Sequence, residues 1–457
     1  MTNSANQAKS HFDALCAQIK RDMKRFRVPG VALGVLVGDE TLTAGFGVTH
    51  IDHPLDVTPD TLFQIGSITK TFVGTAVMRL VEAGKIDLDT TVKTYVPELV
   101  LSDKDAETRV TMRHLLTHVG GWVGDYFDDF GWGEDAIARY VAAMANLPQV
   151  TPLGALYSYN NAGFNLAGRV IERVTGKPFE EALCEAVFKP LGLAHTFVFP
   201  WDAMVHRFVT GHISPYDQAA PVTIGLPWPI GRASHPAGGI ISSVNELLTY
   251  ARFQMGDGSG VLSSASLADM KMPYVVSSAA GEHRGLSWLL RTYGATVVVG
   301  HGGATKGQLA TFQMVPEAHF CIVVLTNSDR GTQVHAEAVT TALRLWLGVE
   351  KENPPEISLA PASLAEYCGR YTSPLWDAEI VLDGERLLVK AIPKGGFPKP
   401  DSPPGPTPPP TQVSFSVPDL AYGLHPLWKG DTFEFLRDGT GQVAYLRAGG
   451  RVRPKVA

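Results

Sequence analysis

The chain has 457 residues, of which 45% are hydrophobic and 18% charged, so it is long enough for two or three globular domains with a large core. Its net charge of −6 provides no basic field for nucleic acid. The N-terminus is polar and lacks the apolar core of a signal peptide, and no apolar run is long enough to span a bilayer. We therefore expect a cytoplasmic protein that binds neither nucleic acid nor membranes.

The N-terminal part predicts a hairpin followed by a helix. Val31 to Gly47 contains two apolar-rich runs around a Gly-Asp-Glu turn, which is typical of a β-hairpin. A helix that begins near Ser67 and ends at Gly84 follows, because its apolar residues recur at helical spacing. These are Ile68, Val73, Val77, Leu80 and Val81.

The middle of the chain predicts a helical insertion between strand-rich ends. Residues 110–244 contain short helical patterns and long loops with many glycines and prolines. Strands are expected at 296–299, 311–315 and 320–325, and a helix at 333–347 would pack on the resulting sheet.

The pattern changes after a proline-containing linker at 353–361. Beyond it only hairpins are expected, and two of them turn at Asp383-Gly384 and Asp438-Gly439, dipeptides that favour tight turns. This pattern predicts a small antiparallel barrel. The segment from Pro393 to Pro410 contains nine prolines, which predicts an extended or mobile loop between the barrel strands.

The first chemical motif is Ser67-Ile68-Thr69-Lys70. Residues three apart on a helix lie on one face, so the Lys70 amine can reach the Ser67 hydroxyl and activate it as a nucleophile. The unpaired backbone N–H groups of a first helical turn would also favour negative charge developing near Ser67. The alternative is an ordinary solvated lysine one turn after a serine.

The second motif is Tyr157-Ser158-Tyr159-Asn160-Asn161, directly before an expected helix. A phenol next to the nucleophile can relay a proton to a leaving group, and an amide can hold both Lys70 and a substrate carbonyl. The alternative is a helix cap, since asparagine caps helix N-termini well.

The third motif, His301-Gly302-Gly303-Ala304, follows the expected strand at 296–299. Glycines at a strand end allow another backbone to approach, and an edge strand can pair with an extended acyl substrate. The alternative is a tight turn with a surface histidine.

A loop of aromatic and acidic residues follows His118 and continues to Trp132. Trp122 and Asp125 are candidate substrate-binding residues in it, because such a surface can hold a substrate ammonium group. The alternative, which the sequence supports equally, is a solvent-exposed acidic loop whose aromatic side chains pack beneath it.

In this order the three motifs resemble the active-site signature of the serine β-lactamase and penicillin-binding-protein superfamily, and the resemblance covers about Phe26 to Leu347. It is greatest for the branch with class C β-lactamases, DD-peptidases, D-aminopeptidases and esterases. The fold it implies is α+β, an antiparallel sheet flanked by helices with an inserted all-helical subdomain at about 80–235. The expected domains are 1–350 for the hydrolase, 351–362 for a linker and 363–457 for a lipocalin-like β-barrel.

The resemblance also implies residue roles. Ser67 would attack the acyl carbonyl, with Lys70 and Tyr159 as a coupled general base and Tyr159 as the acid for the leaving group. The N–H groups of Ser67 and Ala304 would form the oxyanion hole. Lys70 must then be partly neutral, which predicts that it is buried. Asn161, Gly303 and Ala304 would bind substrate.

His301 is the fourth candidate catalytic residue and can hydrogen-bond Tyr159 or a substrate. It stands where true β-lactamases and DD-peptidases carry lysine, which favours an esterase, amidase or peptidase over an antibiotic-degrading enzyme. The expected function is a serine hydrolase that needs no metal or cofactor and cleaves small esters, amides or peptides, D-amino-acid peptides among them. An acyltransferase on the same fold and a non-catalytic ligand-binding module are the alternatives. The only expected partner is the small-molecule or peptide substrate, and a homo-oligomer is left open.

Overall fold

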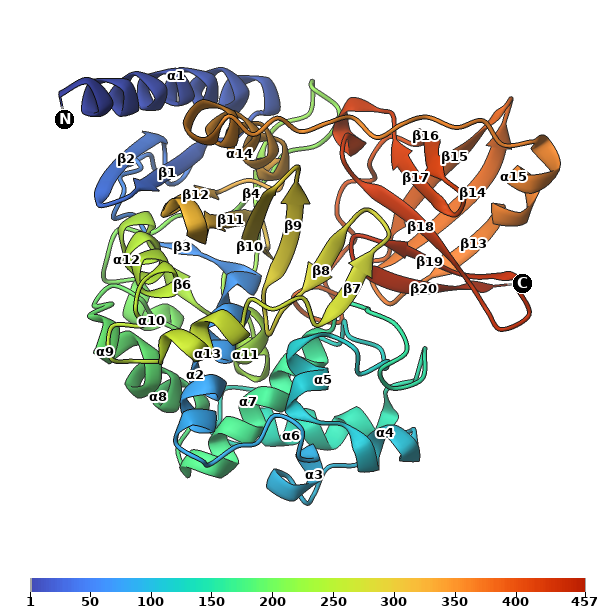
Figure 1. Ribbon diagram of the computed structural model, residues 1–457, viewed down its shortest axis with the longest axis horizontal. Coiled ribbons are helices and arrows are strands. Elements are labelled where there is room, and N and C mark those ends of the chain that lie inside the picture. Colours follow the sequence, from blue (N-terminus) through green and yellow to red (C-terminus); the bar gives the residue numbers. More distant parts are fainter. Residues whose placement is uncertain (1, 457) are drawn as a thin grey trace.

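A twisted sheet of eight antiparallel strands forms the centre of the N-terminal part, in the order β2-β1-β12-β11-β10-β9-β8-β7 (Figure 1). The computed structural model describes residues 2–456, with side chains from residue 6 onward; the predicted domain ends Met1 and Ala457 lie outside these residues. The strands are β1 (Gly30–Val37), β2 (Glu40–Gly47), β7 (Val275–Ser278), β8 (Glu282–Arg284), β9 (Leu289–Tyr293), β10 (Thr296–Thr305), β11 (Gln308–Val315) and β12 (Phe320–Thr326).

The predicted hairpin and strands are confirmed, and distant parts of the chain meet in the sheet. β1 pairs with β2 in the expected hairpin and with β12 on its other side, where Val31 lies opposite Thr326. β10 is longer than predicted, because it continues through the His301 motif and pairs with β11 up to Thr305. Its pairing with β9 ends at Gly300, so the following residues keep a free edge on that side.

Two helices cover one face of the sheet. They are α1 (Thr2–Phe26) and α14 (Gly331–Leu347), which pack on each other and on the sheet around Phe12, Leu15, Ile19 and Val334. α14 was predicted from its apolar pattern. α1 was not, although its buried residues recur every three to four positions, as expected for a helix with one apolar face.

The helical region lies on the opposite side of the sheet from α1 and α14, and α2 connects it to the nucleophile motif (Figure 1). Its helices are α2 (Thr69–Glu82), α3 (Val92–Tyr95), α4 (Lys104–Arg109), α5 (Met112–Leu116), α6 (Ala136–Ala143), α7 (Asn161–Thr175), α8 (Phe179–Leu183), α9 (Lys189–Leu191), α10 (Pro200–Ala203), α11 (His235–Gly238), α12 (Val244–Met255) and α13 (Ser264–Asp269).

The insertion is not purely helical, which corrects the expectation for 80–235. A ribbon of β4 (His212–Ile213) and β5 (Thr223–Ile224) lies inside that range, while β3 (Phe63–Gln64) pairs with β6 (Ile241–Ser242) at its borders. The backbone N–H of His212 donates to the carbonyls of Gly307 and Asn327, so this ribbon is bonded to the loops at the end of the central sheet. Within residues 2–456, no helix combines the length and apolarity needed to cross a membrane.

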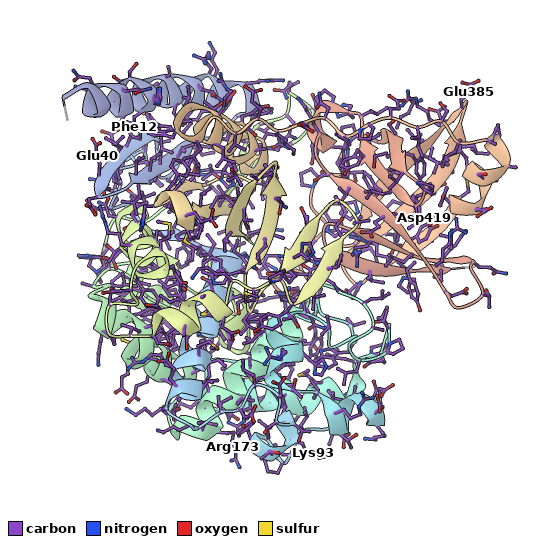
Figure 2. The ribbon with its side chains drawn as sticks, in the orientation of Figure 1. Phe12, Glu40, Lys93, Arg173, Glu385 and Asp419 are labelled. Atoms are coloured by element: carbon purple, nitrogen blue, oxygen red, sulfur yellow. The ribbon has the colours of Figure 1, made fainter. Side chains whose placement is uncertain are left out.

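The predicted antiparallel barrel forms the C-terminal part; it is closed and has eight strands, but a helix that was not predicted precedes it. The strands are β13 (Gly369–Thr372), β14 (Trp376–Asp383), β15 (Arg386–Pro393), β16 (Thr411–Val417), β17 (Leu420–Gly423), β18 (Thr432–Arg437), β19 (Val443–Ala448) and β20 (Arg451–Val456), preceded by α15 (Pro361–Tyr367). Both predicted turns join neighbouring strands. Figure 2 shows Glu385 at the tip of the first of these turns, and Lys93 and Arg173 at the far margin of the helical region.

Candidate active site

Ser67 lies in the 3-10 turn η1 (Gly66–Ile68), which continues directly into α2. The turn touches β10 through backbone atoms: Gly66 has φ +51, and a Cβ there would lie 2.5 Å from the Ala304 nitrogen. A Cβ on Gly303 would lie 1.8 Å from the Ile65 carbonyl oxygen. Two glycines therefore allow the close approach that brings the Ser67 backbone beside Ala304.

Lys70 has no exposed surface, in agreement with the prediction that it is buried. Its Nζ lies 3.0 Å from Ser67 Oγ, 2.8 Å from Asn161 Oδ1 and 2.5 Å from the carbonyl oxygen of Ala237. Burial lowers the pKa of Lys70 well below its usual 10.5, and the nearby Arg451 charge lowers it further. Because a neutral amine has two hydrogens, the Asn161 and Ala237 oxygens can accept both and leave the lone pair for the Ser67 hydroxyl.

Tyr159 lies beside this pair, since Lys70 Nζ is 4.8 Å from the centroid of its ring. His118 stacks on the ring at a centroid distance of 4.4 Å, and Nδ1 of His118 accepts a hydrogen bond from the Asn160 N–H. Burial raises the pKa of the Tyr159 phenol, while the neighbouring Ser67 hydroxyl and Arg451 oppose this rise. The phenol hydroxyl is buried and has no hydrogen-bond partner among the described residues, which leaves it free for a reacting group.

The two asparagines of the second motif have different roles: one caps a helix and the other contacts Lys70. Asn160 is the cap of α7, because its side chain accepts from the Gly163 N–H. Asn161 is the next residue and turns into the site, where Oδ1 binds Lys70 and Nδ2 donates to Asp125 Oδ1 at 2.7 Å. Asn160 is therefore a helix cap, and Asn161 is the residue that contacts Lys70; its catalytic role stays a prediction.

The carboxylates of the aromatic and acidic loop interact with other side chains of the protein. Asp125 pairs with Arg451 at 2.5 Å, Asp128 accepts from the Tyr126 hydroxyl, and Asp129 pairs with Lys399 at 3.0 Å. Asp125 and Asp129 are therefore already paired with cations of the protein, whereas Asp128 keeps an exposed carboxylate without an ion-pair partner among the described residues. Trp122 is 3% exposed and packs in the main core, which corrects its assignment to substrate binding.

His301 lies inside β10 rather than after a strand end, and it is 5% exposed instead of being a surface residue. Its Nδ1 is 2.5 Å from the Gly302 carbonyl oxygen, so this nitrogen carries the proton and Nε2 is the acceptor. Burial lowers the pKa of His301 to about 3. The ring is therefore neutral at ordinary pH, and its centroid lies 6.1 Å from that of Tyr159.

Arg451 was not predicted as a site residue; the barrel brings it beside Tyr159. The turn between β19 and β20 docks beside the second motif, and the Tyr159 N–H donates to the Gly450 carbonyl at 2.8 Å. The Arg451 guanidinium lies 4.8 Å from the centroid of the Tyr159 ring, and Lys70 Nζ lies at the same distance from that ring. Gly449-Gly450 signals a hairpin turn, but nothing local in the sequence indicates where that turn docks.

Replacing Arg451 is expected to shift the pH dependence of activity. Lys70 must be neutral to accept a proton, and removing the Arg451 charge raises its pKa because a repulsive cation is lost and Asp125 is left unpaired. The acidic limb of kcat/KM in Arg451→Gln should therefore move to higher pH. The control is Arg437→Gln, a barrel arginine paired with Asp419. An unchanged limb would contradict the electrostatic coupling.

Ser67 opens into two cavities. A larger cleft of about 540 Å³ runs between the sheet and the barrel and is lined by Tyr159, His301 and, further along, Glu282, Arg291 and Asp431. A smaller pocket of about 190 Å³ shares Ser67, Ala304 and Arg451 with the cleft and includes Asn161. Burial raises the pKa of Asp431 to about 6.

The comparison with family models decides the family. The model described as Beta-lactamase matches residues 16–344, which is most of the chain and includes all three motifs. The chain belongs to the beta-lactamase family. This confirms the superfamily and the fold expected from the motifs.

This beta-lactamase-family protein is similar to named relatives and to solved structures over much of its length. It is 31% identical over 366 residues to Penicillin-binding protein 4 of Amycolatopsis lactamdurans, a match that covers 78% of this chain and 92% of the relative. It is 25% identical to the Unguisins hydrolase ungD' of Aspergillus campestris (strain IBT 28561), over 68% of this chain and 60% of that one. The solved structure of SurE with D-Leu superposes with a TM-score of 0.74 at 25% identity, covering 98% of this chain and 100% of SurE. The protein is thus a serine hydrolase of this superfamily.

Proposed function

We propose that the protein cleaves small esters, amides or peptides through an acyl-enzyme on Ser67, and that peptides with D-amino acids are among its substrates. The observation that carries this proposal is the buried Lys70 amine 3.0 Å from Ser67 Oγ, with two carbonyl-type oxygens to hold its hydrogens. A serine hydroxyl needs such a base to become a nucleophile.

In the proposed reaction the Ser67 hydroxyl proton moves to Lys70 Nζ while Oγ bonds to the acyl carbonyl carbon. The N–H groups of Ser67 and Ala304 stabilise the resulting oxyanion, an effect worth roughly 10²–10³-fold for each donor. Tyr159 then gives its proton to the leaving group and recovers one from Lys70. A water molecule repeats these steps on the acyl-enzyme, releasing the acid and restoring Ser67.

The neutral His301 supports an uncharged ester or amide at this position, because an imidazole with a pKa of about 3 offers no positive charge to a substrate carboxylate. It can still accept a hydrogen bond at Nε2. D-configured substrates are proposed because the SurE structure, similar to this chain over nearly its whole length, contains D-Leu.

An acyltransferase is the second candidate function. The cleft of about 540 Å³ next to Tyr159 has room for an alcohol or amine that could replace water as the acyl acceptor. In that case Lys70, coupled to the Tyr159 phenol, would take the proton of the incoming nucleophile instead of that of a water molecule.

The test is product analysis with a panel of p-nitrophenyl esters, D- and L-aminoacyl nitroanilides and nitrocefin, with and without added amines. Hydrolysis of esters or D-aminoacyl anilides is expected, and Ser67→Ala should lose it. Mainly amide products at modest amine concentration would identify a transferase. If nitrocefin alone were turned over rapidly, the assignment of His301 would be wrong, and undiminished hydrolysis by Ser67→Ala would refute the proposal.

A further inference from the structure

The smaller pocket beside Ser67 has walls of a different character from those of the large cleft. Four partly exposed apolar side chains line it, each from a different loop, and two of these loops belong to the barrel. They are Phe127, Ile230, Leu375 and Phe397. Its volume of about 190 Å³ suits a compact group, since an apolar cavity of about 150 Å³ can hold a benzene molecule.

The barrel walls of the pocket are fixed by contacts. The proline-rich segment was predicted to be extended or mobile, but Phe397 packs edge-on against Phe127 at a centroid distance of 4.8 Å, and Lys399 pairs with Asp129 at 3.0 Å. The Lys394 N–H donates to the Leu375 carbonyl at 2.8 Å, which joins the two barrel loops. Because these side chains are held in place, they can select a substrate by shape.

The charges around the pocket are already balanced. Arg451 binds Asp125 through Nε at 2.5 Å and through Nη2 at 3.2 Å, and Asp129 is occupied by Lys399. A charged substrate group would have to displace one of these pairs, whereas an apolar group would only cover apolar surface. The pocket therefore favours an apolar occupant.

The lining residues also indicate which part of the substrate enters. Tyr159, the proposed acid for the leaving group, lines the large cleft and not the small pocket. Asn161, whose amide is suited to a substrate carbonyl, lines the small pocket. Ser67 and Ala304 line both cavities, so the reacting carbonyl lies where the cleft and the pocket meet. The leaving group then points toward the cleft and the acyl group toward the pocket.

We propose that the pocket formed by Phe127, Ile230, Leu375 and Phe397 binds an aliphatic or aromatic side chain on the acyl side of the scissile bond. The inference rests on the proposed acyl-enzyme function and adds its specificity. The substrate is then an ester or peptide whose residue before the cleaved bond has a side chain of about the size of leucine or phenylalanine.

The test compares the methyl esters of N-acetyl-leucine and N-acetyl-asparagine, in D and L forms. The two side chains have nearly the same shape, and the methanol leaving group is too small to fill either cavity. We expect kcat/KM for the preferred leucine enantiomer to exceed that for asparagine about tenfold or more. Leu375→Asn should reduce this ratio several-fold, whereas Leu382→Asn, an exposed barrel position away from Ser67, should leave it unchanged.

A second measurement does not depend on ester turnover. Labelling of Ser67 by a small alkyl fluorophosphonate is followed by mass spectrometry, and N-acetyl-leucine should slow it at lower concentration than N-acetyl-asparagine does. The pocket assignment would be overturned if N-acetyl-leucine and N-acetyl-asparagine protected Ser67 from labelling equally well. It would also be overturned if Leu375→Asn left the leucine-to-asparagine ratio of kcat/KM unchanged. Neither result would contradict the acyl-enzyme on Ser67. Absence of both turnover and labelling would instead refute the proposed function, and the inference with it.

Discussion

Lys70→Met is expected to lower kcat/KM for ester hydrolysis by roughly 10²–10⁴-fold, the usual contribution of a positioned general base. Methionine fills a similar volume but cannot accept the Ser67 proton. The neighbours Asn161 Oδ1 and Ala237 O lose a donor, and the free energy of unfolding should fall by about 1–3 kcal/mol for each group left unpaired. Steady-state kinetics checks the first effect, and urea unfolding checks the second.

Two further variants separate base chemistry from packing. Lys70→Arg should be as inactive as Lys70→Met, because a guanidinium stays protonated at the pH of the assay. Lys85→Met, an exposed lysine just after α2, should keep the wild-type rate. If Lys70→Met retained more than about a tenth of the activity, Lys70 would not be the general base.

Gly303→Ala is expected to produce the second large loss, because the new methyl group would lie 1.8 Å from the Ile65 carbonyl oxygen. To relieve that overlap, η1 and β10 must move apart. The backbone N–H groups of Ser67 and Ala304, which form the proposed oxyanion hole, then move apart as well. A displacement of about 1 Å in such a site can cost about 10²-fold in rate. Stability should fall by about 1–3 kcal/mol, as for an overpacked core.

Gly302→Ala is the matched control for this effect. Gly302 is the exposed neighbour on β10, and a Cβ there would meet only the Ala310 carbonyl oxygen at 3.7 Å, an ordinary contact. It should retain near wild-type kcat/KM at a temperature where both variants are folded. Equal losses in the two variants would show that the contact between η1 and β10 does not set the rate.

Local spacing was enough to predict the parts of the site that lie on one element. Ser67 and Lys70 are one helical turn apart, so their contact follows from the helix. The central strands at 31–47, 296–299, 311–315 and 320–325, the hairpin turns of the barrel and the helix at 333–347 also follow from local patterns, whereas β7 and β8 were not predicted. By contrast, Tyr159, Asn161 and His301 come from distant elements, and their convergence was predicted only through the resemblance to a known superfamily.

The remaining features of the site depend on how the barrel packs against the N-terminal part, or on the position of a single residue within an element. Arg451, Leu375 and Phe397 reach the site because the barrel packs beside the helical region, which no local pattern encodes. Asn160 and Asn161 have different roles although they are neighbours, because one caps α7 and the other contacts Lys70. His301 was placed after a strand end because glycines weaken strand patterns, yet β10 continues through them with regular pairing to β11.

The proposed reaction requires Ser67 to become acylated during turnover. The most direct test is to quench the reaction with p-nitrophenyl acetate in acid within the first turnovers and to map the digested protein by mass spectrometry. One acetyl group is expected on the peptide that contains Ser67, and none on that peptide in Ser67→Ala. Turnover with Ser67 unmodified and the acetyl group on another residue would contradict it.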